Sequence, residues 1–218
     1  MRIGFYLVWR GDTVHYVLAD MMLRSVRKHM PSVEVVQLTD EKSPAVYGVN
    51  EVRRLPDAPR DVQRVEHLCR CEGDWVFVDT DVLFQRDVSG VFDYHWTARD
   101  WDIGLCDRDG CLVEGEDELE FIKATPYNLG VIFSRSRAFW RATKEKLLAM
   151  SPERQDWLGI QFGACEVIAD GWHGLYILPG KFYNYAPHDT KDEAKDASIV
   201  HYKGPFRKRM MLDRFLEV

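Results

Sequence analysis

WVFVDTDVLF, residues 75–84, is the most strongly strand-like run in the chain. Its first four residues are apolar, which predicts a strand buried on both faces. Asp79 and Asp81 follow where this strand runs out, and side-chain alternation along an extended chain places both carboxylates on the same side. Two like charges this close are costly unless a cation neutralises them. Hard oxygen ligands at the end of a strand suit Mg²⁺ or Mn²⁺, so the stretch predicts a divalent-metal site.

The segments on both sides of this stretch alternate between strand-like and helix-like patterns. Residues 3–9 form a nearly continuous apolar run that predicts a buried strand, and apolar residues then recur at helical spacing up to Pro31. The same reasoning assigns strands to 33–40, 51–56, 101–106, 129–134, 174–179 and 198–203, and helices to 61–71, 136–150 and 154–169. This alternation predicts an α/β fold with a largely parallel sheet that binds ligands at the carboxyl ends of its strands.

The composition is that of an ordinary globular protein with one domain. The 218 residues are 46% hydrophobic and 29% charged, which allows a sizeable core in a single domain over residues 1–218. No run approaches the roughly 20 apolar residues of a membrane helix, and the first strand leaves no room for a signal peptide. Five cysteines without a paired CxxC set favour a reducing, cytoplasmic setting. The net charge of −6 argues against generic nucleic-acid binding.

A second informative stretch, IVHYKGPFRK, occupies residues 199–208. His201 at the end of a strand can donate an imidazole nitrogen to a transition-metal ion such as Mn²⁺. Gly204 lets the backbone approach phosphate oxygens, and Pro205 fixes the turn. Arg207 and Lys208 can then supply positive charge to a departing diphosphate. Together with the Asp-x-Asp triplet, this stretch favours a site that holds a diphosphate through a metal ion.

A phosphatase is the main competing interpretation of the Asp-x-Asp triplet. Aspartate-nucleophile phosphatases also end a hydrophobic strand in Asp-x-Asp, and the first carboxylate attacks phosphorus. In that superfamily the motif normally opens the chain. Here it falls at position 79, after two complete strand–helix units, which favours the nucleotide-sugar alternative.

The order and spacing of these motifs resemble those of GT-A type glycosyltransferases, especially the retaining galactosyltransferase and glycogenin-like group. The counterparts are WVFVDTD at 75–81 and HYKGPFRK at 201–208. Between them, YNLGVIFS resembles the group's Asn-x-Gly strand, and Arg64 stands where the group has a basic residue on the preceding helix. The resemblance extends over roughly residues 1–208. It implies a Rossmann-like GT-A fold, a nucleotide-sugar donor such as a UDP-sugar, and Mn²⁺ or Mg²⁺ as cofactor.

The resemblance also implies roles for individual residues. Metal ligation is implied for Asp79, Asp81 and His201. Donor contacts are implied for Val8, Trp9, Asp40, Arg64, Asp79, Thr80, Gly130, Lys203, Gly204, Arg207 and Lys208. Roles at the reaction centre are implied for Asn128, Gln161 and Asp156. The group's Asp-Gln pair reads Ile160-Gln161 here, so Asp156 or Glu166 is the candidate for the missing acid, and no nucleophile is assigned.

The implied reaction transfers a sugar, hexosyl or pentosyl, from a nucleoside diphosphate to a hydroxyl, with retention at the anomeric carbon. A glycan or another small hydroxyl compound is favoured as acceptor by the acidic composition. The alternative acceptor is a hydroxylated base in DNA, as in phage DNA glycosyltransferases, because residues 203–214 carry five cations. A catalytically idle nucleotide-sugar binder and the phosphatase are the non-transferase alternatives. The acidic residues of 107–120 are expected to form a solvated face.

Overall fold

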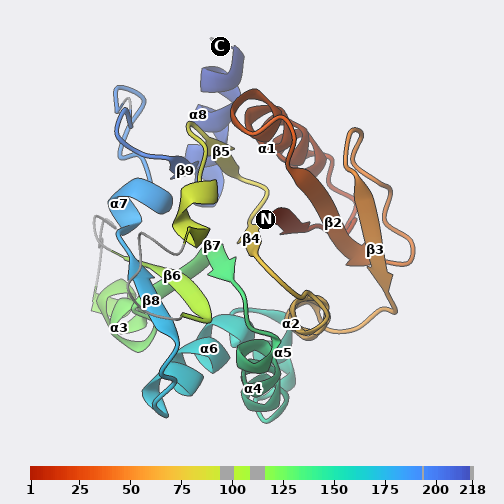
Figure 1. The fold of residues 1–218 in the computed structure, drawn as a ribbon, viewed down its shortest axis with the longest axis vertical. Helices are drawn as coiled ribbons and strands as arrows, with labels where there is room; N and C mark the ends of the chain where they lie inside the picture. The colour runs from red at the N-terminus through yellow and green to blue at the C-terminus, as the bar shows by residue number, and fades with distance from the viewer. Residues whose placement is uncertain (94–100, 109–115, 193, 217–218) are drawn as a thin grey trace.

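The computed structural model describes residues 1–93, 101–108, 116–192 and 194–216, which form an α/β fold (Figure 1). Its main sheet has the strand order β3-β2-β1-β4-β7-β6-β8. These strands are β1 (Arg2–Tyr6), β2 (Glu34–Asp40), β3 (Glu51–Leu55), β4 (Trp75–Val78), β6 (Ile103–Asp107), β7 (Tyr127–Ser134) and β8 (Leu175–Leu178). Neighbouring strands are parallel, except that β7 runs antiparallel to both β4 and β6. The predicted α/β fold with a mostly parallel sheet is confirmed.

Helices cover both faces of this sheet, and side-chain alternation along β4 shows how. Val76 and Val78 point into the core that is shared with α1 (Val14–His29). Trp75 and Phe77 point to the opposite face. That face is covered by α2 (Arg60–Cys69), α4 (Arg137–Leu148) and α6 (Gly159–Ala169). Figure 1 shows α1 on one side of β4 and these three helices on the other.

The remaining helices are short or lie at the margins of the sheet. They are η1 (Ser89–Phe92), α3 (Glu116–Ala124), α5 (Pro152–Asp156), α7 (Gly180–Tyr183) and α8 (Gly204–Leu216). α8 packs against α1 through a third core cluster that includes Met210 and Met211. None of the helices in the described ranges is both long and apolar enough to cross a membrane.

The stretch 75–84 does not continue as one strand, because its two ends belong to different sheets. β4 ends at Val78, and the Asp79 N–H still donates to the Gly130 carbonyl at 2.9 Å. The chain then leaves the main sheet, and β5 (Val82–Phe84) pairs antiparallel with β9 (Ile199–His201). Residues 79–81 therefore form a corner between the two sheets, and this corner is close to the C-terminal part of the chain.

Two other segments differ from the sequence prediction. The helix expected over 154–169 is divided into α5 and α6, because Leu158 adopts a left-handed backbone conformation with φ of 63°. The predicted turn after Lys203 consists of Gly204, at φ 77°, and leads directly into α8. Pro205 suits the first turn of a helix because its missing N–H would have no partner there. Of the acidic segment 107–120, residues 109–115 lie outside the described residues.

Candidate active site

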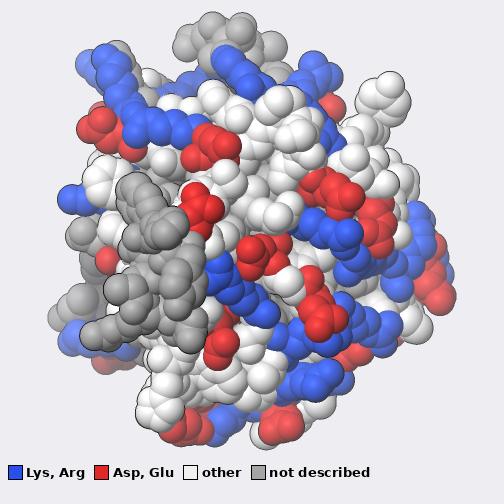
Figure 2. Space-filling model, viewed as in Figure 1, with Lys and Arg blue, Asp and Glu red and all other residues white. Residues whose placement is uncertain are grey.

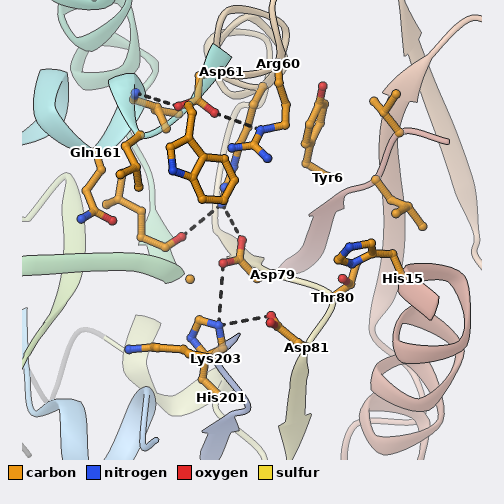
Figure 3. A pocket seen from close by; sticks show the side chains of 18 of the residues that line it. Tyr6, His15, Arg60, Asp61, Asp79, Thr80, Asp81, Gln161, His201 and Lys203 are labelled. Carbon is orange, nitrogen blue, oxygen red and sulfur yellow. Dashed lines mark hydrogen bonds and ion pairs between the residues drawn. The ribbon is translucent and has the colours of Figure 1, made fainter. Parts of the chain in front are cut away.

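Three side chains able to bind a metal meet at the corner between the two sheets (Figure 3). Asp79 and Asp81 lie in the connection from β4 to β5, and His201 ends β9. The pairing of Val82 with His201 brings the imidazole beside Asp81. His201 Nε2 lies 3.2 Å from Asp81 Oδ1 and 3.8 Å from Asp79 Oδ2. One ligand atom from each of the three residues lies within 4.8 Å of the others.

A chain of hydrogen bonds orients the His201 ring. The Gly130 N–H donates to Asn128 Oδ1 at 2.9 Å, so this atom must be the amide oxygen. Asn184 Nδ2 donates to the same oxygen at 2.8 Å, which leaves Asn184 Oδ1 to accept from His201 Nδ1 at 2.8 Å. With Nδ1 as the donor, the neutral imidazole has its lone pair on Nε2, which faces the two carboxylates. This is the tautomer that binds a metal through Nε2.

Gly130 leaves the space that the His201 ring occupies. A Cβ at position 130 would lie 2.0 Å from His201 Cε1 and 2.5 Å from Nδ1. No side chain larger than hydrogen fits there without moving the ring. The Asn-x-Gly strand β7 thus supports the site in two ways, with the Asn128 amide and with the missing side chain of Gly130.

Lys208 places a positive charge beside the Asp81 carboxylate. This carboxylate is largely buried, and Lys208 Nζ in α8 lies 3.4 Å from Oδ2. Burial alone would raise the pKa of Asp81, but the contact with His201 and the charge of Lys208 outweigh burial and hold the pKa below its ordinary value. Asp81 is therefore ionised at neutral pH, as a metal ligand must be.

Arg64 of α2 positions the other carboxylate. Its guanidinium donates to Asp79 Oδ1 at 3.0 Å and to the Leu129 carbonyl at 3.1 Å. The second contact ties the arginine to β7, so the guanidinium that binds Asp79 is itself fixed in place. Because Oδ1 is engaged by Arg64, Oδ2 is the oxygen that faces His201.

The three side chains suit a divalent ion of the Mg²⁺ or Mn²⁺ type. Two carboxylates supply hard oxygen ligands and two negative charges, and the imidazole nitrogen favours Mn²⁺ over Mg²⁺. The hydrogen-bonded support of His201 and the ion pair at Asp79 are the outer contacts that metal sites commonly have. A divalent metal therefore fits the site by charge, ligand type and tautomer.

The candidate metal site opens into a cavity of about 760 Å³. Its walls come from the carboxyl ends of β1 and β4, from α2 and α6, and from the start of α8. Most sequence-predicted site residues line it: Val8, Arg64, Asp79, Thr80, Asp81, Asn128, Gly130, Gln161, His201, Lys203, Gly204 and Lys208. A volume of this size is in the range of cavities that hold cofactor-sized ligands, about 300–1,000 Å³.

Trp9, Asp40, Asp156 and Arg207 do not line this cavity. The Trp9 ring packs edge-on against Tyr16, with ring centroids 5.4 Å apart. The Asp40 carboxylate accepts the N–H groups of the loop that follows β2.

Asp156 accepts the backbone N–H of Arg60 at 2.9 Å, and Arg10 approaches the same oxygen at 3.5 Å. Arg207 donates to the Pro187 carbonyl at 2.7 Å. Asp156 and Arg207 therefore contact other parts of the protein and lie beside the cavity.

Several cavity residues carry no motif in the sequence. Arg60 and Asp61 of α2 contribute to the wall, and Trp157 lies beside them with its ring 4.0 Å from the Arg60 guanidinium. Asp61 had a usable signal, because it precedes Arg64 by three residues and therefore shares its helix face. Asn184 had none, since its contact with His201 arises only from the tertiary fold.

Sequence comparison gives no relatives: no protein-family model matches the chain, and no curated protein matches it. Solved structures do match over the whole chain. The galactosyltransferase LgtC, in complex with donor and acceptor sugar analogs, aligns with a TM-score of 0.60 at 13% identity, covering 100% of this chain and 96% of LgtC.

Two further matches are also glycosyltransferases. One is involved in the glycosylation of the major capsid of PBCV-1, with a TM-score of 0.61 at 12% identity and 100% coverage of both chains. The other is GlyE of Streptococcus pneumoniae TIGR4, with a TM-score of 0.61 at 10% identity, covering 99% of this chain and 60% of GlyE. At these identities the likeness establishes the fold alone, and the chain has the GT-A fold that its motifs predicted.

Proposed function

We propose that this protein is a metal-dependent glycosyltransferase that moves a sugar from a nucleoside diphosphate to an acceptor hydroxyl. The observation that carries the proposal is the group of Asp79, Asp81 and His201, with the imidazole held in the metal-binding tautomer. This group lies in a large cavity, and the chain shares its fold with glycosyltransferases of known structure. Mn²⁺ is the preferred ion of the proposal because one ligand is an imidazole.

Charge around the site fits a diphosphate. A bound divalent ion would act as a Lewis acid on the leaving diphosphate. Lys208 and Lys203 line the same side of the cavity and would add positive charge to it. Gly204 between them lets the backbone come close to phosphate oxygens. Arg64 keeps Asp79 in place for the ion.

The donor would lie across the carboxyl edge of the sheet. Its nucleoside would lie near Val8 and Thr80, and a uridine donor is the first to test. The sugar would lie near Asn128 and Gln161, on the α6 side of the metal site. In the reaction, the bond from the anomeric carbon to the diphosphate oxygen breaks, a bond to the acceptor oxygen forms, and the proton of the acceptor hydroxyl passes to the departing diphosphate. The proposal includes retention of configuration at the anomeric carbon, because the glycosyltransferase group that the sequence resembles retains that configuration.

A glycan or another small hydroxyl compound is the proposed acceptor. DNA would need free cations, and three cations of the basic run contact the protein itself. Lys208 pairs with Asp81, Arg207 donates to Pro187, and Arg214 donates to the Tyr202 hydroxyl. On the face drawn in Figure 2, blue and red side chains of the described residues are interspersed. The cytoplasmic location expected from the sequence stays a prediction.

The test is slow donor hydrolysis. The protein is incubated with Mn²⁺ and a panel of UDP- and GDP-sugars, and released nucleoside diphosphate is measured. We expect release with at least one donor, loss of release with EDTA, and a decrease of roughly 100-fold or more in Asp81→Asn. Asp170→Asn is the matched control, because it makes the same chemical change in an exposed carboxylate that pairs with Lys146.

Other outcomes would favour the competing functions. Release of inorganic phosphate from a simple phosphate monoester would indicate the phosphatase. Tight donor binding without any release, with or without acceptors, would indicate an idle nucleotide-sugar binder. A salt-sensitive gel shift with double-stranded DNA would favour the DNA acceptor.

A further inference from the structure

A buried carboxylate that the sequence motifs do not include contributes to the cavity. Asp61 lies in the first turn of α2, and only 3% of its side chain is exposed. Burial raises the pKa of this carboxyl, although Arg64 and Arg60 act in the opposite direction. Asp is rarely buried so deeply without several partners, because removing an ionised group from water is costly.

The contacts of Asp61 leave most of its accepting capacity unused. Its Oδ2 accepts the Ile160 N–H at 3.2 Å. Its Oδ1 lies 3.5 Å from Arg60 Nε, which is beyond the usual hydrogen-bond range of about 2.7–3.2 Å. A carboxylate can accept roughly four hydrogen bonds. Within the described chain, this one has a single hydrogen bond and one longer ion pair, and it borders the cavity.

The residue next to this contact is also short of partners. Gln161 follows Ile160 in α6, lines the cavity and is 7% exposed. Its amide nitrogen is buried and has no hydrogen-bond partner among the described residues. The cavity wall thus contains an acceptor at Asp61 and a donor at Gln161 that are both short of partners. A hydroxyl group both donates and accepts, so a polyol such as a sugar ring satisfies both.

The position of Asp61 relative to the metal site fits the sugar of the donor. Arg64, which contacts Asp79, is three residues further along α2, or about 4.5 Å of helix rise. In Figure 3, Asp61 and Gln161 lie on one side of Asp79, with His201 and Asp81 on the other. A diphosphate held at the metal would therefore leave its sugar within reach of Asp61.

We propose that Asp61 accepts hydrogen bonds from hydroxyl groups of the transferred sugar and so helps to select that sugar. The inference rests on the proposed function. Asp61 does so from α2, and its carboxylate is bound to the backbone N–H of Ile160, the position on α6 where the sequence lacks an acid. The two candidates that the sequence offered for this missing acid do not line the cavity. Asp156 binds the Arg60 N–H, and Glu166 is exposed on α6.

Two substitutions separate sugar binding from a structural role. Asp61→Asn keeps an oxygen for the Ile160 N–H but removes the charge and half of the accepting capacity. Asp61→Ala removes the contact altogether and reports what the tie to α6 contributes to stability. Asp57→Asn is the control, because Asp57 lies just before the same helix and pairs with exposed Lys42.

The experiment measures two dissociation constants in Mn²⁺ by calorimetry, for the nucleoside diphosphate and for its sugar conjugate that the wild type binds best. In Asp61→Asn, we expect the conjugate to bind about 10- to 100-fold more weakly, as for the loss of a hydrogen bond to a charged group. The free nucleoside diphosphate should bind within about twofold of wild type. A donor that lacks the sugar hydroxyl bound by Asp61 should bind wild type as weakly as the complete donor binds Asp61→Asn. The same deoxy donor should bind Asp61→Asn no more weakly than the complete donor does.

The possible results separate this inference from the proposed function. If Asp61→Asn binds both ligands like wild type, or weakens both equally, Asp61 is a structural residue and the inference is overturned while the metal site stands. If wild type binds neither a nucleoside diphosphate nor its sugar conjugates in Mn²⁺, the proposed function itself is overturned and this inference with it.

Discussion

Gly130→Ala tests the geometry of the metal site with the smallest change that the chain allows. The new Cβ would lie 2.0 Å from His201 Cε1, whereas ordinary carbon contacts are about 3.5–4.0 Å. The ring must therefore move by roughly 1.5 Å. Metal–ligand distances tolerate only about 0.2 Å, so Nε2 would no longer reach an ion held by Asp79 and Asp81. The backbone of Gly130 does not have a positive φ, so the effect comes from the collisions of the new Cβ with the His201 ring and, at 2.8 Å, with Asn128 Oδ1 rather than from backbone strain.

We expect Gly130→Ala to lower Mn²⁺ affinity by at least about 10- to 100-fold, measured by calorimetry. Overpacking a buried site should also lower the free energy of unfolding by about 1–3 kcal/mol. Gly90→Ala is the matched control, because its Cβ would meet only Asp93 Oδ2, at an ordinary 3.8 Å. Wild-type Mn²⁺ affinity in a folded Gly130→Ala protein would refute the proposed contact between β7 and His201.

Three further predictions follow from named contacts. Asn184→Ala should lower Mn²⁺ affinity by about 10- to 100-fold in a titration, because His201 Nδ1 loses its acceptor. Lys208→Ala should weaken binding of a nucleoside diphosphate in Mn²⁺, whereas Arg207→Ala should leave it near wild type, since Arg207 donates to a backbone carbonyl outside the cavity. Burial lowers the pKa of His67 from 6.5 to about 4, so the unfolded state binds more protons between these values and the free energy of unfolding falls as the pH falls. Between pH 7 and pH 5, denaturant unfolding of wild type should show a fall of about 2 kcal/mol in the free energy of unfolding that His67→Gln does not show. Equal pH dependence in the two proteins would contradict this.

The fold was predictable because its signals are local. The apolar residues 75–78 specify a buried strand, and alternation within them matches the two faces of the sheet that the structure shows. The break after β4 and the turn between α5 and α6 were not predictable, because no local sequence signal marks them. The chain leaves the main sheet after Val78 because β5 pairs with β9, more than 100 residues later. The turn at Leu158 depends on a backbone conformation that a leucine rarely adopts, so no sequence pattern announces it.

The site was predictable where a residue type implies its chemistry. Carboxylates at the end of a buried strand and a late histidine pointed to a metal, and the structure brings the three together. Residues that act through tertiary contacts were missed. Asn184 accepts from the His201 imidazole, and Asp61 accepts from the Ile160 N–H of α6. Neighbouring cations could not be told apart either. They lie in α8, where successive side chains differ by about 100° in direction, so Lys208 faces Asp81 while its neighbour Arg207 donates to the Pro187 carbonyl.

The most direct test of the metal site is an anomalous diffraction map from crystals soaked in Mn²⁺ and a nucleoside diphosphate. We expect a single strong peak at about 2.0–2.3 Å from an oxygen of Asp79, an oxygen of Asp81 and Nε2 of His201. Asp81→Asn crystals soaked in the same way should lack the peak. A manganese peak elsewhere in the cavity, away from Asp79, Asp81 and His201, would show that these three residues do not form the metal site.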